Sequence, residues 1–376
     1  MEQTTKKRIL IFSLAYDPFV GGAEVAIKKI TDLLPEYEWE MITCNLDGRQ
    51  KAAEKIGNIS VHRIGGGKSA KYSFSWLAFN FARRLQQKQP YDIIWAMMAN
   101  QAGWAALKFK REFPRVKYLL TLQEGDSEFD ILIRTFFIRH IYKAIYRQAD
   151  HIQAISNYLK ARAVRLGAKC PIEVIPNGID VSRVKEKVLR ADPEEKIVIT
   201  ASRLVKKNGI GYLIEAIGIL RKKNIPVILW VVGSGKLENK LKKMAAGLGI
   251  ADKVKFFGQV SNDQVYELLS QADIFARPSL SEGLGNAFLE AMAAGLPTIG
   301  TPVGGIPDFL KDGETGWLSA ARNSAGIAEK IRYILDEKNL ERVVVVNKQG
   351  SDLARGMYNW QSVAKEMNDI ILKLTS

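Results

Sequence analysis

The sequence has few of the residues that build disulfide frameworks or zinc sites. Its 376 residues include two cysteines, Cys44 and Cys170, and three histidines. Two cysteines are too few for a disulfide framework and are compatible with a reducing compartment. His62, His140 and His151 are scattered along the chain, so we expect no zinc site.

The chain also lacks a long apolar run. No uncharged stretch reaches the length of about 18 residues that is needed to span a bilayer. The apolar run near the N-terminus, residues 9–15, is short and is closed by Asp17 and Pro18. A signal peptide needs a longer apolar core, so we expect a strand there and a cytoplasmic protein.

Two common phosphate-binding motifs are missing. Gly233-Ser234-Gly235 lacks the third glycine of a dinucleotide-binding turn, and Gly67-Lys68-Ser69 has His62 where a P-loop needs its first glycine. Neither dinucleotide binding nor P-loop chemistry is therefore expected.

Positive charge is abundant. The net charge is +15, of which residues 1–178 contribute +10 and the rest +5. A basic surface indicates an anionic partner, such as nucleic acid, a lipid headgroup or a phosphorylated substrate. Composition does not choose among them, but no nucleic-acid-binding motif is present, so we expect no nucleic-acid partner.

Short β-branched runs alternate with longer helical patterns along the whole chain. Several runs are almost continuously apolar, as expected for strands buried on both faces of a parallel sheet. We expect strands at residues 9–15, 39–44, 92–97, 116–122, 152–155, 172–175, 196–201, 227–232, 254–257, 273–276 and 297–300. We expect helices at residues 23–34, 73–89, 157–166, 209–222, 236–248, 263–271 and 285–294.

This alternation predicts an α/β fold with two doubly wound, Rossmann-like domains, because the length exceeds what one core usually serves. Turn residues at 176–178 place the boundary, giving domains at 1–178 and 179–356. Such domains bind ligands at the carboxyl ends of their strands, so two that face each other would form an interdomain cleft.

The most informative segment is PSLSEGLGNAFLEAMAAG, residues 278–295. A loop rich in serine and glycine follows an apolar strand and opens a helix, whose free N–H groups favour a phosphate. Glu282 precedes the helix and Glu290 lies about one turn inside it, where carboxylates can accept hydrogen bonds from sugar hydroxyls. The alternative is that Glu282 only caps the helix and Glu290 is a solvated surface charge.

Two further segments follow strands. Arg203, Lys206 and Lys207 come after the strand at 196–201 and could stabilise a leaving phosphate without a metal. The alternative is a solvated basic loop. Gly21 and Gly22 follow the first strand and could bring backbone N–H groups against an anion, or could simply form a tight turn.

On these residues the chain resembles the retaining glycosyltransferases of family 4, which have the GT-B fold. The two glutamates separated by seven residues are the hallmark, and YDPFVGGAE, VIPNGID, SRLVKKNGIGYLIEA, GSGKLENKLKKMAAGLGI and DIFARPS support it over nearly the whole length. The tail around Trp360 resembles the family's last helix, at about 357–376, which crosses back to the first domain.

The resemblance implies a role for each motif in binding a nucleotide-sugar co-substrate. It implies that Arg203 and a lysine bind the diphosphate, that Glu282 contacts the transferred sugar and that Glu290 contacts the ribose. The remaining donor-binding residues that it implies are Gly22, Gly283, Leu284, Gly285, Asn286 and, near the base, Gln259.

Two positions depart from the family's pattern. The usual lysine position is Asn208 here, so Lys207, Lys206 or Asn208 itself is the second phosphate ligand. Many members have a histidine in the loop after the strand at 116–122; this chain has Glu124 and Asp126 there, and we expect them on the acceptor side.

The predicted function is therefore transfer of a sugar from a nucleotide diphosphate to a hydroxyl, with retained configuration and without a metal or other cofactor. The Asp-x-Asp metal clamp of the other main transferase fold is absent from the sequence. The alternatives are a sugar-nucleotide epimerase of the same fold and a carbohydrate-binding protein without turnover.

One segment of the first domain indicates the acceptor. Residues 131–148 (ILIRTFFIRHIYKAIYRQ) contain Arg134, Arg139, Lys143 and Arg147 but no acidic residue. As one helix it would present basic side chains beside an apolar and aromatic face, which is typical of a segment on an anionic membrane. The acceptor would then be a glycan or lipid-linked group at the inner membrane face; otherwise the apolar face packs on the sheet.

Overall fold

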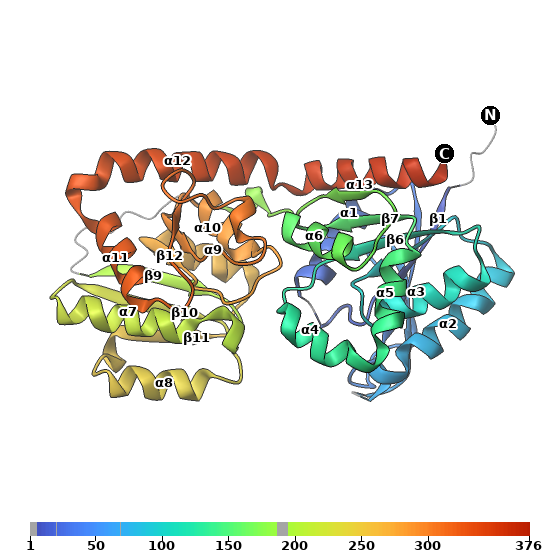
Figure 1. Cartoon of the computed structure of the whole chain (residues 1–376), viewed down its shortest axis with the longest axis horizontal. Coiled ribbons are helices and arrows are strands. Elements are labelled where there is room, and N and C mark those ends of the chain that lie inside the picture. Colours follow the sequence, from blue (N-terminus) through green and yellow to red (C-terminus); the bar gives the residue numbers. More distant parts are fainter. Residues whose placement is uncertain (1–5, 20, 68, 186–194) are drawn as a thin grey trace. The chain divides into compact units, whose positions relative to one another are not determined.

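The computed structural model describes residues 6–19, 21–67, 69–185 and 195–376. The chain forms two compact units, each of which is described by itself (Figure 1). Unit 1 comprises Met1–Gly178 and Trp360–Ser376, and unit 2 comprises Ile179–Asn359. Each unit is a mainly parallel sheet with helices on its faces, which confirms the predicted doubly wound α/β class.

The sheet of unit 1 has the strand order β3-β4-β2-β1-β5-β6-β7-β8. All neighbouring pairs are parallel except β3 with β4. The strands are β1 (Arg8–Phe12), β2 (Glu38–Cys44), β3 (Ala53–Ile56), β4 (Ile59–Ile64), β5 (Ile93–Met97), β6 (Lys117–Leu122), β7 (His151–Ala154) and β8 (Ile172–Val174). The chain runs outward from β1 on one side and from β5 on the other, so the topological switch point lies between them.

The helices of unit 1 cover both faces of this sheet. α2 and α3 pack on one face, with α5 against α3, while α1 and α13 pack together on the other (Figure 1). The helices are α1 (Gly22–Leu33), α2 (Ala70–Lys88), α3 (Gln101–Glu112), α4 (Glu128–Thr135), the 3-10 helix η1 (Phe136–Ile138), α5 (Arg139–Arg147), α6 (Asn157–Arg165) and α13 (Trp360–Thr375). Trp360, Met367 and Ile370 of α13 are buried in the same core as Ile27 of α1, so the C-terminal helix completes unit 1.

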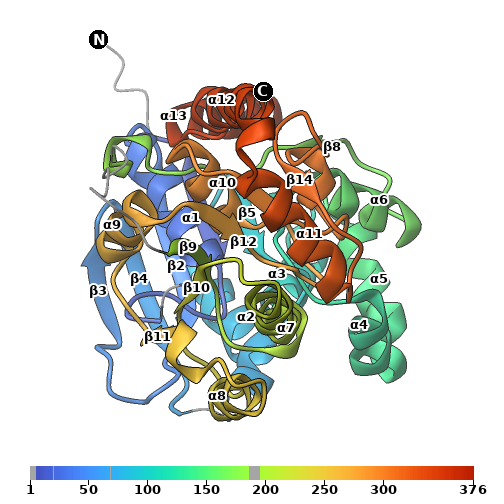
Figure 2. The ribbon, with the colours of Figure 1, turned by 90° about the vertical axis from the view of Figure 1, so that its left-hand side faces the viewer.

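The sheet of unit 2 is parallel throughout, with the order β11-β10-β9-β12-β13-β14. Its strands are β9 (Lys196–Ala201), β10 (Val227–Val232), β11 (Val254–Gly258), β12 (Ile274–Ala276), β13 (Thr298–Gly300) and β14 (Trp317–Leu318). Its switch point lies between β9 and β12. α7 and α8 lie on one side of the sheet and α9, α10 and α12 on the other (Figure 2).

The helices of unit 2 are α7 (Ile210–Lys222), α8 (Glu238–Gly247), α9 (Asn262–Gln271), α10 (Asn286–Ala293), α11 (Ser324–Leu335) and α12 (Leu340–Met357). Short 3-10 helices are η2 (Val181–Arg183), η3 (Lys206–Asn208), η4 (Ala251–Lys253), η5 (Ile306–Asp308) and η6 (Glu337–Asn339). Because Met357 ends α12, the last helix of the chain begins at Trp360 and not at the predicted residue 357.

The prediction of one helix over residues 131–148 is wrong. The segment is divided among α4, η1 and α5. The break falls in the run Thr135–Ile138, where β-branched and aromatic residues lower the helix propensity and Thr135 bonds back to the carbonyl of Ile131. The expected continuous apolar face is divided too: Tyr142 and Tyr146 are buried in the core, whereas Phe136 and Phe137 are exposed.

Candidate active site

Unit 2 gathers most of the predicted donor-binding residues at its switch point. Arg203 follows β9 directly, and Glu282 and the start of α10 follow β12, the neighbouring parallel strand. The carboxyl ends of parallel strands lie at the same edge of a sheet, and the switch point opens a crevice there. The fold therefore brings together two segments that are about 80 residues apart in the sequence.

Close backbone contacts interlock the loops at this edge. A Cβ added to Gly209, whose φ is +68°, would lie 1.9 Å from the carbonyl oxygen of Pro278, and one added to Gly233, with φ +120°, would lie 2.1 Å from that of Ser202. The amide of Leu280 donates to the carbonyl of Lys207 at 2.6 Å. Only glycine allows these approaches, so the sequence holds the loops after β9, β10 and β12 in fixed contact.

A buried ion pair lies at the centre of these loops. Arg277, at the end of β12, donates from Nη2 to Oε2 of Glu282 at 2.6 Å, and the two side chains are 7% and 17% exposed. Nη1 of Arg277 donates to the carbonyl of Ala201 at 3.3 Å, which ties β12 to the end of β9. Burial lowers the pKa of Arg277, and the nearby carboxylates oppose this shift. Arg277 was not among the predicted site residues, although the sequence shows a charged residue between an apolar strand and Pro278.

Glu282 is therefore held in place before any ligand arrives. Its Oε2 accepts from Arg277, and its Oε1 accepts from the amide of Gly283 at 3.2 Å. A carboxylate has about four lone-pair positions, so both oxygens can still accept from a hydroxyl. The alternative that Glu282 only caps the helix is wrong, because the N-cap residue of α10 is Gly285 and no side chain caps this helix.

The start of α10 presents free amide groups. Its N-cap residue is Gly285, with φ +102°, and no side chain caps the helix. Gly283, Leu284 and Gly285 are buried, and Asn286 is half-buried. No acidic residue occupies the first turn. An uncapped helix start of this kind favours an anion, as the sequence predicts for the diphosphate.

Glu290 lies on the same helix beside other acidic groups. It is half-buried, and burial raises its pKa to about 7; Arg277 opposes this shift and Asp180 adds to it. Tyr266 is buried near both carboxylates, and burial together with their charge raises its pKa. Glu290 is therefore not a solvated surface charge, and near neutral pH its carboxyl group can both donate and accept hydrogen bonds.

The basic loop after β9 divides into exposed and buried side chains. Arg203 and Lys206 are exposed and Lys207 is half-buried, whereas Asn208 is buried. The side-chain Nδ2 of Asn208 donates to the carbonyl of Arg203 at 2.6 Å, so this side chain shapes the loop. Among the described residues, neither Arg203 nor Lys206 forms an ion pair. The two lysines are therefore better placed than Asn208 to meet a phosphate.

Gln259 lies at the edge of this group of loops. It is exposed and follows β11, whose last residue, Gly258, accepts from the amide of Gly233 at 2.8 Å. The structure places Gln259 one strand further from the switch point than Arg203, since β10 separates β11 from β9. This position is compatible with the predicted role of Gln259 near the base of a nucleotide-sugar donor.

In unit 1, Gly22 lies at the start of α1 near a pair of amide side chains. The predicted free amide of Gly21 is bonded within the chain, since it donates to the carboxylate of Glu24 at 2.8 Å. Gly22 is exposed, and a Cβ added to it would lie 4.0 Å from Nδ2 of Asn177. Asn177 and Gln123 exchange two hydrogen bonds of 3.1 Å. Three strand ends of unit 1 thus meet here.

Glu124 and Asp126 both line a pocket at the switch point of unit 1. Its volume is about 650 Å³, and Met98, which also lines it, has a φ of +72°. Oε1 of Glu124 accepts from the amide of Ala99 at 2.6 Å, while Oε2 is buried without a protein partner in the described part of the chain. Burial raises the pKa of Glu124, and the amide of Ala99 and Arg162 oppose this. We name this the acceptor pocket, after the acceptor-side role that the sequence predicts for Glu124 and Asp126.

Asp126 is engaged within the chain. Its carboxylate accepts from Nη2 of Arg134 at 2.5 Å, and its carbonyl accepts from Nη2 of Arg162 at 3.1 Å. Of the two acceptor-side candidates, Glu124 is thus the one with a buried, unpartnered oxygen at the pocket.

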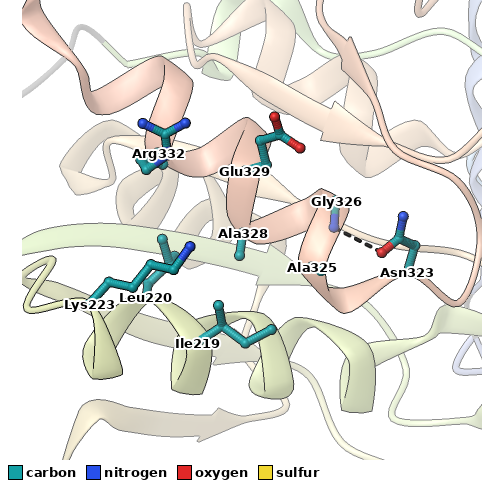
Figure 3. Close-up of a pocket in the computed structure, with 9 residues that line it drawn as sticks. All are labelled: Ile219, Leu220, Lys223, Asn323, Ala325, Gly326, Ala328, Glu329 and Arg332. Atoms are coloured by element: carbon teal, nitrogen blue, oxygen red, sulfur yellow. Dashed lines mark hydrogen bonds between the residues drawn. The ribbon is translucent and has the colours of Figure 1, made fainter.

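Another pocket of unit 2, of about 370 Å³, lies between α7 and α11 (Figure 3). Its charged side chains are Lys223, Glu329 and Arg332. It shares no residue with the loops at the switch point, so it lies outside the candidate active site.

Two negative findings hold for the described residues alone. They contain no cluster of three or more His, Cys, Asp or Glu side chains that could hold a metal. They also contain no helix with the length and apolar content needed to cross a bilayer.

The sequence matches two family models in succession. The one described as Glycosyltransferase Family 4 matches residues 20–183, and the one described as Glycosyl transferases group 1 matches residues 181–350. An uncharacterized glycosyltransferase of Methanocaldococcus jannaschii is 33% identical over 389 residues, which cover 96% of each protein.

One further relative and one solved structure have named activities. A GDP-mannose-dependent alpha-(1-6)-phosphatidylinositol monomannoside mannosyltransferase of Mycobacterium tuberculosis is 29% identical over 249 residues, covering 62% of this chain and 64% of that protein. The match therefore spans less than two thirds of that relative. The structure of a sucrose-phosphate synthase from Thermosynechococcus elongatus superposes with a TM-score of 0.85 at 20% identity, covering 98% of this chain and 99% of that one. At this identity the likeness shows the GT-B fold alone.

Proposed function

Because this chain belongs to glycosyltransferase family 4, we propose that it transfers a sugar from a nucleoside diphosphate donor to a hydroxyl acceptor. The observation that carries the proposal is the buried Arg277–Glu282 pair beside the uncapped start of α10. A fixed carboxylate next to an anion-binding helix start fits a sugar attached to a diphosphate.

Each part of the donor has its own residues in this proposal. The diphosphate lies at the start of α10, contacted by the backbone of Gly283–Asn286 and by Arg203 and Lys207. Glu282 accepts from hydroxyls of the transferred sugar, Glu290 contacts the ribose, and Gln259 lies near the base. GDP-mannose, the donor in the name of the mycobacterial relative, is the first donor to test.

The chemistry relies on positioning and charge. Arg203 and Lys207 stabilise the departing diphosphate, as charge-assisted hydrogen bonds to phosphate oxygens do. Departure breaks the bond between the anomeric carbon and the diphosphate and leaves an oxocarbenium-like sugar. The acceptor oxygen then bonds to the anomeric carbon on the same face while a phosphate oxygen takes its proton, so the configuration is retained. No metal takes part, because the cationic side chains neutralise the leaving group.

The acceptor is a glycan or a lipid-linked glycan at the cytoplasmic face of a membrane, bound by the acceptor pocket of unit 1. Glu124 contacts the acceptor there, since its Oε2 atom has no protein partner in the described residues. Asp126 lies beside it and holds Arg134. Nucleic acid is not a substrate.

Two substitutions test this division of the donor, with all assays in excess EDTA. Glu282→Ala should abolish transfer but leave the affinity for the nucleoside diphosphate within about threefold, since a contact to the sugar is absent from that ligand. Glu290→Ala should weaken the nucleoside diphosphate by about 1–3 kcal/mol, the range for a charge-assisted hydrogen bond. Calorimetric titration measures both affinities.

Glu329→Ala is the matched control, because it removes an exposed glutamate of unit 2 at the pocket of Figure 3. It should change neither quantity. Loss of nucleotide affinity in Glu282→Ala would show that this residue contacts another part of the donor. A strict need for manganese or magnesium would overturn the proposed stabilisation of the leaving group. Conversion of the donor without an acceptor would instead identify an epimerase.

A further inference from the structure

The surface of unit 1 carries a ridge of exposed apolar side chains on α4 and η1. Phe129, Leu132 and Ile133 recur at helical spacing on α4 and therefore share one face, and Phe136 of η1 follows them. They are 69%, 44%, 60% and 64% exposed, and the adjoining Phe137 is 90% exposed. An apolar cluster of this density is uncommon on the surface of a monomer and marks an interaction site. We name these five residues the apolar ridge.

A pocket of about 480 Å³ adjoins the ridge, since Phe129 and Leu132 also line it. Four cationic side chains line the same pocket: Arg139, Lys143, Arg162 and Arg165. Its acidic residue, Glu128, forms an ion pair with Arg165. We name this the basic pocket; its charge favours an anionic occupant.

Arg162 is the reason to expect a phosphate group in the basic pocket. This side chain is 3% exposed, and its Nη2 donates to the hydroxyl of Tyr158 at 2.8 Å and to the carbonyl of Asp126 at 3.1 Å. Its Nε and Nη1 atoms are buried and have no hydrogen-bond partner within the described residues. Leaving such donors unpaired is costly, and the oxygens of a phosphate group would satisfy them.

We propose that the apolar ridge enters an anionic membrane surface while the basic pocket binds the phosphate group of a lipid. An occupant that is anionic at one end and apolar beside it fits both features, as a lipid does. The reason for membrane binding rests on the proposed function. The basic pocket shares Ile131, Thr135 and Tyr142 with the acceptor pocket. A lipid-linked acceptor whose phosphate lies in the basic pocket would therefore be held next to Glu124.

The test is co-sedimentation of the full chain, without any donor, with vesicles of phosphatidylglycerol and phosphatidylcholine or of phosphatidylcholine alone. The chain should sediment with the anionic vesicles at low salt and be released as salt screens the charges. Arg139→Glu with Lys143→Glu should lower the partition coefficient at least 25-fold, because each basic residue contributes about fivefold. Phe136→Ala with Phe137→Ala should lower it about tenfold or more through lost apolar burial.

Matched controls distinguish the role of the apolar ridge and basic pocket from the effects of net charge and of lost apolar groups in general. Lys240→Glu with Lys243→Glu changes the net charge equally at exposed positions of α8, and Val344→Ala with Val345→Ala removes exposed apolar groups from α12. Both should bind like the wild type. Absence of sedimentation at low salt would overturn the proposal, as would equal losses in the controls. Self-association that the Phe136→Ala, Phe137→Ala variant abolishes, without vesicle binding, would show that a second copy covers the ridge. Because no donor is present, these outcomes do not depend on sugar transfer.

Discussion

Replacing Gly209 by alanine should separate the two loops that form the donor site. The added Cβ would lie 1.9 Å from the carbonyl oxygen of Pro278, well inside van der Waals contact, so the loops must move apart by about 1 Å or more. The φ of +68° adds about 1–2 kcal/mol for a residue with a Cβ, and losing the hydrogen bond from Leu280 to Lys207 adds about 1 kcal/mol. Unit 2 should therefore lose about 2–3 kcal/mol of stability.

The effect on transfer should be larger than the effect on stability. Arg203 and Lys207 lie on one of these loops and Glu282 on the other, and a misplacement of about 1 Å can cost about 100-fold in rate. We expect kcat/KM for the donor to fall about 100-fold in protein that is still folded at 25 °C. The assay combines urea unfolding with steady-state kinetics.

Gly211→Ala is the control, because this glycine lies two residues further along, inside α7. Its added Cβ would meet Met244 Sδ at an ordinary 3.5 Å, and alanine in a helix interior stabilises by about 0.5–1 kcal/mol. Stability and kinetics for Gly209→Ala that equal those of the wild type would refute the interlocked donor site.

Two further predictions concern single charged groups. Arg203→Ala should weaken nucleoside diphosphate binding about 10- to 100-fold, since arginine can bind two phosphate oxygens at once. Lys207→Ala should weaken it less and Lys206→Ala least, as measured by calorimetric titration. Near-wild-type affinities for both lysine variants would show that another residue is the second phosphate ligand. The native pKa of Glu290, about 7, lies above the ordinary 4.5, so its contribution to stability is complete below pH 4.5 and is lost as the pH rises through 7. From pH 5 to 8 the free energy of unfolding of the wild type, measured in urea, should therefore fall by about 2–3 kcal/mol relative to that of Glu290→Gln. Free energies of unfolding that change in parallel with pH in the two proteins would contradict this.

The fold was largely predictable, because buried parallel strands appear as apolar runs. The run at 196–201 is β9, and that at 227–232 is β10. The β3–β4 pair was missed, since β3 at the sheet edge is half exposed and contains Glu54 and Lys55. Residues 131–148 do not form one helix, because the run Thr135–Ile138 interrupts it, and the alternative of packing into the core holds for Tyr142 and Tyr146 of α5.

The site was predictable only where a residue follows a strand in a recognisable motif. Glu282, Arg203 and the start of α10 could be placed at the same sheet edge from the order of elements, and their roles stay predictions. Arg277 could not be found, because its partner Glu282 and the carbonyl of Ala201 meet it only in the folded sheet. The buried donors of Arg162 depend in the same way on packing.

The most direct test of the central claim is to incubate the chain in excess EDTA with a panel of nucleotide sugars, GDP-mannose included, and a lipid extract as acceptor. Chromatography then follows the nucleoside diphosphate and the labelled sugar together. We predict that one donor releases its nucleoside diphosphate in step with the appearance of a glycosylated acceptor, and that Glu282→Ala abolishes both. Release or conversion of the donor that is indifferent to the acceptor, or that persists in Glu282→Ala, would contradict the account.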